Sequence, residues 1–306
     1  MTALAAVVGV ALDQLVGEPP LSWHPVARYG SLMAHIERSV YADRRSNGVA
    51  FAIIGVGIGV VTGTSLRRAI GRSAASIVAT AVCSAGRMLD GEARAVALLT
   101  TDGDLPAARA RLRSLVGRTA DHLDEPEISR AVIESVAENS VDAVVSSLIW
   151  ATIGGAPAVF AHRAVNTLDA MVGHRNTRYE HFGWASARLD DFANYVPARF
   201  AAMTVALARP TRAPSIWRAV RRDAARHPSP NGGVIEAAYA AALDVRLGGV
   251  NRYHGAIEDR GTLGTGAKPT ATTIDSAISL RRQATAIGAL LMLVVSVVRF
   301  RFRKWP

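Results

Sequence analysis

The sequence predicts an all-α, polytopic integral membrane protein, and three observations lead to this fold class. Half of the 306 residues are hydrophobic but only 6% are aromatic, so small Ala, Val and Gly side chains must fill much of the interior. Residues 49–66 carry no charge and reach the length of a transmembrane helix. Gly55, Gly59 and Gly63 recur every four residues there, so one helix face is smooth enough for a second helix to approach closely.

Other apolar stretches bring the expected number of membrane-embedded helices to roughly four or five. Residues 1–12 lack the basic leader of a signal peptide and indicate a short membrane-associated or buried helix. Residues 73–86 are uncharged and would return from the first span as a hairpin. Residues 284–298 form a terminal membrane helix, and the basic tail that follows at 299–304 predicts a cytoplasmic C-terminus.

The uncharged run at 143–161 is also long enough to span a bilayer, but its composition argues against a simple spanning helix. Gly154, Gly155 and Pro157 would break the helix in the middle of the run. We therefore expect a re-entrant or tightly packed helix that presents its acidic N-terminal half to water.

The charge balance favours anionic partners. The net charge is +10, and the basic runs are not interleaved with aromatic side chains. Anionic lipid of the bilayer and phosphorylated small molecules are therefore favoured over nucleic acid. The single cysteine, Cys83, excludes an internal disulfide.

The central stretch, residues 128–159, carries acidic residues within an apolar pattern. Glu134, Glu138 and Asp142 lie at i, i+4 and i+8, so an α-helix would stack the three carboxylates on one face. Such an arrangement needs a cation or a bound Lys or Arg side chain to compensate it, and a divalent metal is the simplest candidate. Asn139 could add a neutral oxygen of the kind Mg²⁺ accepts. The alternative is a solvated helix face.

Two later stretches are also rich in oxygen ligands. Asn166 and Asp169 lie three apart, and Asp190 or Asp191 precedes Asn194 by three or four positions, so each set would share a helix face. Together with the central carboxylates they predict a shared Mg²⁺ and phosphate site. Taken alone, each stretch is more often a salt-bridged surface.

Residues 227–249 predict a turn that leads into a helix. Ser229 or Asn231 could cap this helix, and Gly232 and Gly233 would let backbone N–H groups approach an anion, which is the mechanism of a phosphate cradle. Residues 261–268 imitate a P-loop but place the lysine one position late and a proline where Ser or Thr is needed, so we expect a flexible loop there.

Several blocks in consistent order, from residue 13 to about residue 255, resemble the CobD/CbiB family of cobalamin biosynthesis. They are GEPPLSWHPV, ESVAENSVDAVVSSLIW, AVNTLDAMVGHRN, FGWASARLDDFANYVPARF and HPSPNGGVIEAAYAAALDVRLGG. The chain departs from the family pattern at Ser147, where proline is expected, and at Gly232 or Gly233, where alanine is common. These departures should leave the chemistry intact.

The resemblance implies an integral membrane enzyme, an adenosylcobinamide-phosphate synthase. Such enzymes join the propionate carboxyl of adenosylcobyric acid to aminopropanol or aminopropanol phosphate in an ATP-dependent amide bond. ATP would be the co-substrate, Mg²⁺ the cofactor, and other enzymes of the pathway possible partners. The expected location is a multi-pass position in the cell membrane with the active site facing the cytoplasm.

Roles for individual residues follow from residue type within this implied chemistry. Arg175 and Arg188 could offset phosphate charge, and His174 or His24 could accept the amine proton. The carboxylates already named are the expected metal ligands, with the central three as first choice and Asp190 and Asp191 as second.

The whole chain, 1–306, is expected to form one membrane domain. Residues 1–86 would supply N-terminal membrane helices, 87–280 a polar catalytic region with embedded helices, and 281–306 the terminal helix and tail. Two rival functions stay open. The first is a membrane transporter, since intramembrane carboxylates often mark ion pathways, and the second is a non-catalytic corrinoid-binding scaffold.

Overall fold

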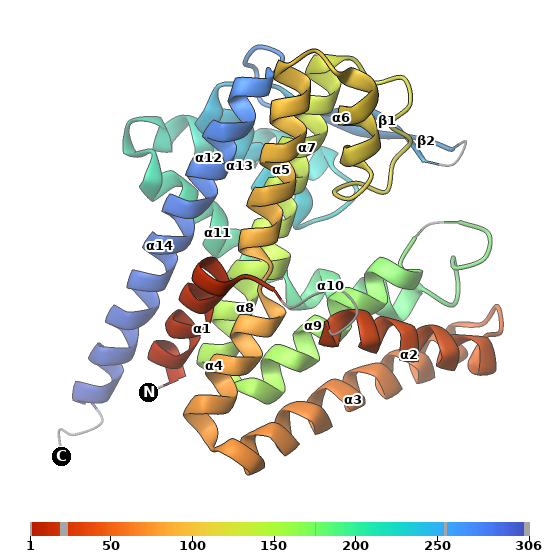
Figure 1. The fold of residues 1–306 in the computed structure, drawn as a ribbon, viewed down its shortest axis with the longest axis vertical. Coiled ribbons are helices and arrows are strands. Elements are labelled where there is room, and N and C mark those ends of the chain that lie inside the picture. The colour runs from red at the N-terminus through yellow and green to blue at the C-terminus, as the bar shows by residue number, and fades with distance from the viewer. Residues whose placement is uncertain (1, 19–23, 175, 254–255, 303–306) are drawn as a thin grey trace. The chain divides into compact units, whose positions relative to one another are not determined.

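The computed structural model describes residues 2–18, 24–174, 176–253 and 256–302, and nearly all of them lie in helices (Figure 1). The expected all-α character is confirmed, apart from one two-stranded sheet among these residues. The elements in chain order are α1 (Thr2–Val16), α2 (Pro25–Val40), α3 (Arg45–Ile70), α4 (Arg72–Cys83), α5 (Gly86–Thr101), α6 (Leu105–Leu112), α7 (Glu125–Ser140), the π-turn η1 (Val141–Val145), α8 (Ser146–Gly154), α9 (Ala156–Val172), α10 (Trp184–Ala193), α11 (Tyr195–Ala208), the 3₁₀ turn η2 (Pro210–Arg212), α12 (Ala213–Asp223), the 3₁₀ turn η3 (Ala224–Arg226), α13 (Gly232–Leu243), β1 (Leu247–Tyr253), β2 (Ala256–Leu263) and α14 (Ala271–Phe302).

The chain forms two compact units, each assembled from separate stretches. Unit 1 comprises residues 1–86, 142–194 and 289–306, and unit 2 comprises residues 87–141 and 195–288. The expected organisation as one domain of three successive parts stays a prediction, and each unit is described by itself below.

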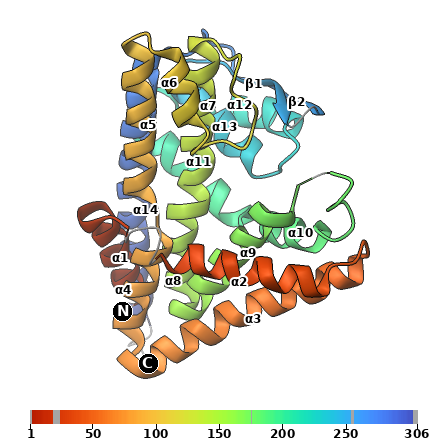
Figure 2. The same cartoon turned by 45° about the vertical axis from the view of Figure 1, so that its right-hand side comes forward.

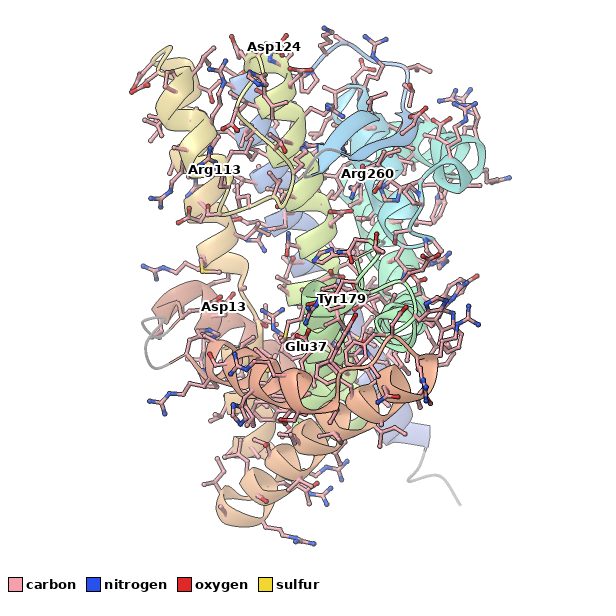
Figure 3. All side chains as sticks on the ribbon, turned by 90° about the vertical axis from the view of Figure 1, so that its right-hand side faces the viewer. Asp13, Glu37, Arg113, Asp124, Tyr179 and Arg260 are labelled. Carbon is pink, nitrogen blue, oxygen red and sulfur yellow. The ribbon has the colours of Figure 1, made fainter. Side chains whose placement is uncertain are left out.

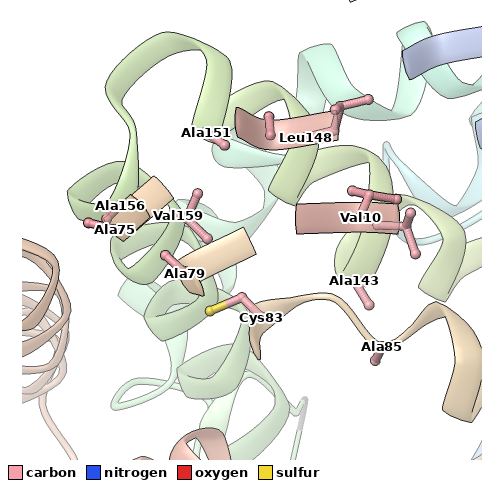
Figure 4. Packing of buried hydrophobic residues seen from close by; sticks show 12 residues of the cluster. Val10, Ala75, Ala79, Cys83, Ala85, Ala143, Leu148, Ala151, Ala156 and Val159 are labelled. Atoms are coloured by element: carbon pink, nitrogen blue, oxygen red, sulfur yellow. The ribbon is translucent and has the colours of Figure 1, made fainter. Parts of the chain in front are cut away.

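The core of unit 1 is built from small side chains, as the composition suggests. Alanines and valines of α1, α4, α8 and α9 pack around Cys83 and Leu148, all of them buried (Figure 4). A second cluster, centred on Met33, Phe51 and Phe182, fills the space between α2, α3 and α9, where α2 and α3 lie side by side (Figure 2).

The glycine stripe of α3 lies against α9, which confirms the expected close helix approach. A Cβ atom added at Gly59 would lie 2.7 Å from the carbonyl oxygen of Phe160, and one at Gly63 would lie 2.5 Å from Cα of Pro157. Because those contacts are with backbone atoms, which cannot move aside as side chains do, only glycine allows this packing.

The helical run through the central acidic stretch is interrupted twice. The π-turn at Val141–Val145 follows α7, so the regular α-helical spacing that was expected to carry Glu134, Glu138 and Asp142 does not continue through Asp142. The second interruption is at Gly155, which has a φ of 67° and separates α8 from α9. The break predicted from Gly154, Gly155 and Pro157 is therefore confirmed.

Unit 2 contains the hairpin that the sequence did not indicate. Strands β1 and β2 pair antiparallel, with Val250 opposite Asp259 and an irregularity between Gly248 and Val250. Gly248 has a φ of 75°, and a Cβ atom there would lie 2.0 Å from the carbonyl oxygen of Gly261. The expected flexible loop at 261–268 begins instead as the end of β2, because the glycines serve a tight strand irregularity.

Two helices of the described chain are long and apolar enough to cross a membrane. They are Arg45–Ile70, with a mean hydropathy of 2.0, and Ala271–Val297, with a mean hydropathy of 1.4. Both were expected as spans. The helices at Thr2–Val16 and Arg72–Cys83 have 15 and 12 residues, so the total of four or five membrane helices is not confirmed.

The glycine stripe makes a testable prediction. Replacing Gly59 by Leu should lower the free energy of unfolding by about 1–3 kcal/mol, because the new side chain would meet the backbone of α9. Gly57 is the matched control on the same helix, since a Cβ atom there meets nothing within 4 Å. Thermal unfolding in detergent, followed by circular dichroism, should show a lower midpoint for Gly59→Leu than for Gly57→Leu. Equal midpoints would refute the close packing.

Candidate functional site

Each unit contains a candidate cluster of buried and half-buried charged and polar side chains. In unit 1 the cluster, here called the acid–amide network, consists of Asp142, Asn166, Asp190 and Asn194. In unit 2 the cluster, here called the Glu–His–Glu cluster, consists of Glu138, His227 and Glu236. Figure 3 shows the side chains of the whole molecule and labels Arg260, which contacts the second cluster.

Asn166, on α9, links the two acids of the acid–amide network. Its Nδ2 donates to Oδ2 of Asp142 at 3.1 Å and to Oδ1 of Asp190 at 3.4 Å. Asn194 Nδ2 donates to the same Asp190 oxygen at 3.0 Å. Three elements, η1, α9 and α10, therefore bring together oxygen-rich stretches that lie far apart in the sequence.

Asn194 is held firmly in place. Its side-chain oxygen accepts a hydrogen bond from Ser146 Oγ at 2.7 Å and lies 2.8 Å from His162 Nε2, and all three residues are buried. Because both ends of the amide are engaged, Asn194 fixes the orientation of the Asp190 carboxylate.

Negative charge accumulates around this network. Burial raises the pKa of Asp190 to about 6, against hydrogen bonds from Asn194 and Asn166 that lower it. Burial, together with the carboxylates of Asp190 and Asp191, raises the pKa of Asp169 to about 7. Carboxylate and amide oxygens are the ligands that Mg²⁺ prefers, so the donor chemistry of the network fits that ion.

A cavity of about 240 Å³ lies beside the network, between α2, α3 and α9. Its walls are mostly apolar, with Leu32, Ile58 and Phe160 among them, but Arg28 and Arg163 also line it. Arg163 connects the cavity to the network, because its Nη1 donates to Asn166 Oδ1 at 3.2 Å. An anionic group in the cavity would therefore meet guanidinium charge on a framework coupled to the acids.

His24 and Glu18 lie near the same cavity. His24 caps α2, and its Nδ1 accepts the N–H of Val26 at 3.3 Å, while its Nε2 lies 3.0 Å from Oε2 of Glu18. Burial, and then the charge of Arg163, lowers the pKa of His24. Burial raises the pKa of Glu18 to about 7, with Arg163 opposing and Asp13 adding to the rise.

The remaining expected residues of unit 1 are less engaged. His174 and Arg188 are exposed, and Arg188 Nη1 lies 4.0 Å from Oδ2 of Asp191. Arg175 lies outside the described residues. The structure thus links Asp142 and Asp190 through Asn166, while the roles expected for all of these residues, and for His174, Arg175, Arg188 and Asp191, stay predictions.

The Glu–His–Glu cluster forms where three elements of unit 2 meet. One ligand atom from each of Glu138 on α7, His227 before α13 and Glu236 on α13 lies within 4.8 Å of the others. Oε1 of Glu236 lies 3.4 Å from Nε2 of His227. Sequence reasoning selected Glu138 alone. The missed signal is Glu236, the one charged residue within the apolar helix Gly232–Leu243.

Glu236 and His227, the two buried members of the cluster, shift each other's pKa. Burial, reinforced by the carboxylates of Glu138 and Glu134, raises the pKa of Glu236 to about 8, although its contact with His227 works in the opposite direction. For His227, burial favours the neutral ring, but Glu236 outweighs it, so the pKa of His227 is raised.

The turn before α13 differs in part from the expected phosphate cradle. Ser229 Oγ accepts the N–H groups of Asn231 and Gly232 at 3.3 and 3.1 Å, and Ser229 O accepts the N–H of Gly233 at 3.2 Å. Asn231 Oδ1 accepts a hydrogen bond from Arg199 at 2.8 Å. These amides are therefore engaged within the chain, and phosphate binding at Ser229, Asn231, Gly232 and Gly233 stays a prediction.

Glu134 is compensated by neighbours of its own. Its carboxylate lies 2.8 Å from Arg118 Nη2 and 3.5 Å from Arg130 Nη1, and it accepts the N–H of Gly248 at 2.8 Å. Arg118 and Arg130 thus compensate the charge of Glu134, and its hydrogen bond with Gly248 connects α7 to the hairpin. Glu134 does not need a metal ion to balance its charge. Asp142, the third member of the expected carboxylate face, belongs to unit 1.

Comparison with known proteins gives a consistent result over the whole chain. The family model described as CobD/Cbib protein matches residues 6–281. The chain is 45% identical over 305 residues to the cobalamin biosynthesis protein CobD of Mycobacterium tuberculosis strain H37Rv, covering 98% of this chain and 97% of that protein. It is 42% identical over 313 residues to CobD of Geobacter metallireducens, covering 97% and 98%. No solved structure matches the chain.

Glu18 should make stability depend on pH. Its pKa is about 7 in the folded protein against an ordinary value of 4.5, so between these values the folded state retains a proton that the unfolded state releases. Raising the pH from about 4.5 to 7 should therefore destabilise the wild type relative to Glu18→Gln, and the difference should level off above pH 7. Melting temperatures of both proteins across this range test it, and a pH-independent difference would contradict it.

Proposed function

Because the chain belongs to the CobD/CbiB family of cobalamin biosynthesis, we propose that it joins the propionate carboxylate of adenosylcobyric acid to aminopropanol or aminopropanol phosphate in an ATP-dependent amide-forming reaction. The product is adenosylcobinamide or its phosphate. The observation that carries the proposal is the acid–amide network beside a cavity that Arg163 lines.

The proposed reaction has two steps, because a free carboxylate is a poor acyl donor: it has no leaving group until one oxygen is phosphorylated. A carboxylate oxygen of the corrinoid attacks the γ-phosphorus of ATP, which forms an acyl phosphate and releases ADP. The amine nitrogen then attacks the acyl carbon, the bond from carbon to the phosphate oxygen breaks, and inorganic phosphate leaves. The proton lost by the amine passes to a base.

Asp142 and Asp190 would hold Mg²⁺, with Asn166 setting the direction of both carboxylates. Mg²⁺, when bound, would neutralise phosphate charge at this site. Asp169 and Asp191 add negative charge around it, which favours retention of a divalent ion.

The arginines and the cavity walls would bind and orient the reacting groups. Arg163 and Arg28 offer guanidinium donors to phosphate or carboxylate oxygens, and apolar side chains such as Phe160 exclude water that would hydrolyse an acyl phosphate. His24 precedes Pro25 and Val26 in the cavity wall, and its lowered pKa favours the neutral imidazole. Its Nδ1 would accept the amine proton in place of the 3.3 Å hydrogen bond from the N–H of Val26, while Nε2 stays directed at Glu18.

The proposal includes a multi-pass position in the cell membrane. The helices Arg45–Ile70 and Ala271–Val297 would provide spans, and the site would face the cytoplasm, where ATP is present. The positive charge of the chain supports binding of anionic lipid headgroups and of phosphorylated substrates.

The test uses full-length protein in detergent with adenosylcobyric acid, ATP, Mg²⁺ and aminopropanol phosphate. Asp190→Asn keeps an oxygen that can accept from Asn166 and Asn194 but removes the charge, so kcat should fall about a hundredfold. The matched control in unit 1 is Asp43→Asn, whose side chain is 55% exposed and pairs with His181, and its rate should stay within about twofold.

The amide product is measured by mass spectrometry, and ADP should be released in an amount equal to that product. A full rate in Asp190→Asn would refute the metal assignment. Corrinoid binding without product would favour a scaffold, and vesicle uptake without ATP turnover would favour a transporter.

A further inference from the structure

Glu236 places a carboxyl group in the interior of unit 2 that the surrounding protein groups satisfy only in part. Its side chain is completely buried, and neither carboxylate oxygen has a hydrogen-bond partner among the described residues. The same holds for Nε2 of His227, whose side chain is 1% exposed. A buried polar atom without a partner costs free energy, so three such atoms directed at one another indicate a missing binding partner.

Arg260 does not resolve this charge. Its Nη1 lies 3.8 Å from Oε1 of Glu236, beyond hydrogen-bonding distance, and 3.4 Å from Oε1 of Glu138. Its Nε is engaged with Glu258 at 3.1 Å. The guanidinium therefore pairs mainly at the rim of the cluster, and the deepest carboxylate stays without a donor.

His227 is oriented as a metal ligand requires. The N–H of Ser229 donates to its Nδ1 at 3.0 Å, and the carbonyl oxygen of Ser229 lies 3.2 Å from the same nitrogen, so Nε2 points toward Glu236. On binding a metal, Nε2 would lose its proton, and Nδ1 could then carry a proton and donate it to the Ser229 carbonyl. Metal-binding histidines usually donate their second ring nitrogen to such an acceptor.

The two glycines before α13 make room for the cluster. A Cβ atom at Gly232 would lie 2.8 Å from Cε1 of His227 and 3.0 Å from Oε1 of Glu138, and one at Gly233 would lie 2.7 Å from Cβ of His227. Larger residues would push the imidazole and the Glu138 carboxylate away from Glu236. This gives Gly232 and Gly233 a function in the chain besides the expected contact with phosphate.

From these contacts we propose that Glu138, His227 and Glu236 bind one divalent transition-metal ion, at a site separate from the Mg²⁺ expected in unit 1. Around a metal with bonds of about 2.0–2.2 Å, neighbouring ligand atoms lie about 3–3.6 Å apart and opposite ones about 4.0–4.4 Å apart, so ligand atoms within 4.8 Å of one another would have to move closer by at most about 2 Å, which side-chain rotation can supply. Two carboxylates balance the charge of a divalent ion. An imidazole beside them favours ions such as Mn²⁺, Fe²⁺, Co²⁺ or Zn²⁺ over Mg²⁺.

The experiment titrates metal-free, full-length protein in detergent with Co²⁺ in a background of millimolar Mg²⁺, which occupies oxygen-only sites and is spectroscopically silent. The visible d–d absorption of Co²⁺ reports nitrogen and oxygen ligation. The wild type should bind one Co²⁺ per chain with a saturable band. His227→Gln and Glu236→Gln should each weaken this binding at least about tenfold. Asp190→Asn, in the other unit, should leave it unchanged.

Melting temperatures are measured in the same samples, so that weak Co²⁺ binding by a variant can be distinguished from poor folding of that variant. Glu236→Gln replaces the buried carboxyl group by a neutral amide of similar size, so the metal-free variant should fold as the metal-free wild type does, and its melting temperature should no longer rise with Co²⁺. Equal Co²⁺ binding in the wild type and His227→Gln would overturn the proposal, as would a wild type with no saturable band. Neither result depends on amide synthesis, so the proposed function is tested separately.

Discussion

A buried carboxylate must face a cation or hydrogen-bond donors, because its desolvation otherwise costs several kcal/mol. This constraint explains the contacts of the charged residues inside both units. Asp90, fully buried in unit 2, is held by Nε and Nη2 of Arg281, both at 2.7 Å, and Arg281 is itself 1% exposed. Glu134 meets Arg118 in the same way. Both acids therefore depend on a partner from another part of the chain.

The two candidate sites differ from the pair formed by Asp90 and Arg281. In unit 1, amide groups of Asn166 and Asn194 donate to oxygens of Asp142 and Asp190, which gives the mixture of carboxylate and amide oxygens that a hard cation accepts. In unit 2, the buried Glu236 faces a histidine and another acid, and neither of its carboxylate oxygens has a hydrogen-bond partner among the described residues. A carboxylate used only for stability would be paired as Asp90 is. The partial pairing of Glu236 is therefore better explained by a transition-metal ion.

The sequence predicted the features that depend on local pattern. The glycine stripe of α3 and the break at Gly155 follow from residue size and backbone freedom within a few positions, and both were confirmed. The same reasoning missed the hairpin, whose glycines serve a strand irregularity, and it missed His227. The turn before α13 places His227 over Glu236, an arrangement that only the folded chain shows. An isolated acid in an apolar helix was the available signal for Glu236. The π-turn at Val141 likewise could not be anticipated from a regular four-residue spacing.

The contacts of the buried Glu236 carboxylate lead most directly to the expectation that a metal ion binds it. An anomalous difference map from crystals of the full-length protein grown with Co²⁺ and Mg²⁺ would test this claim at atomic positions. We expect a cobalt peak within bonding distance of His227 Nε2 and of the Glu138 and Glu236 carboxylates. An ordered cluster without a peak, in which Glu236 is hydrogen-bonded to protein or water alone, would contradict it.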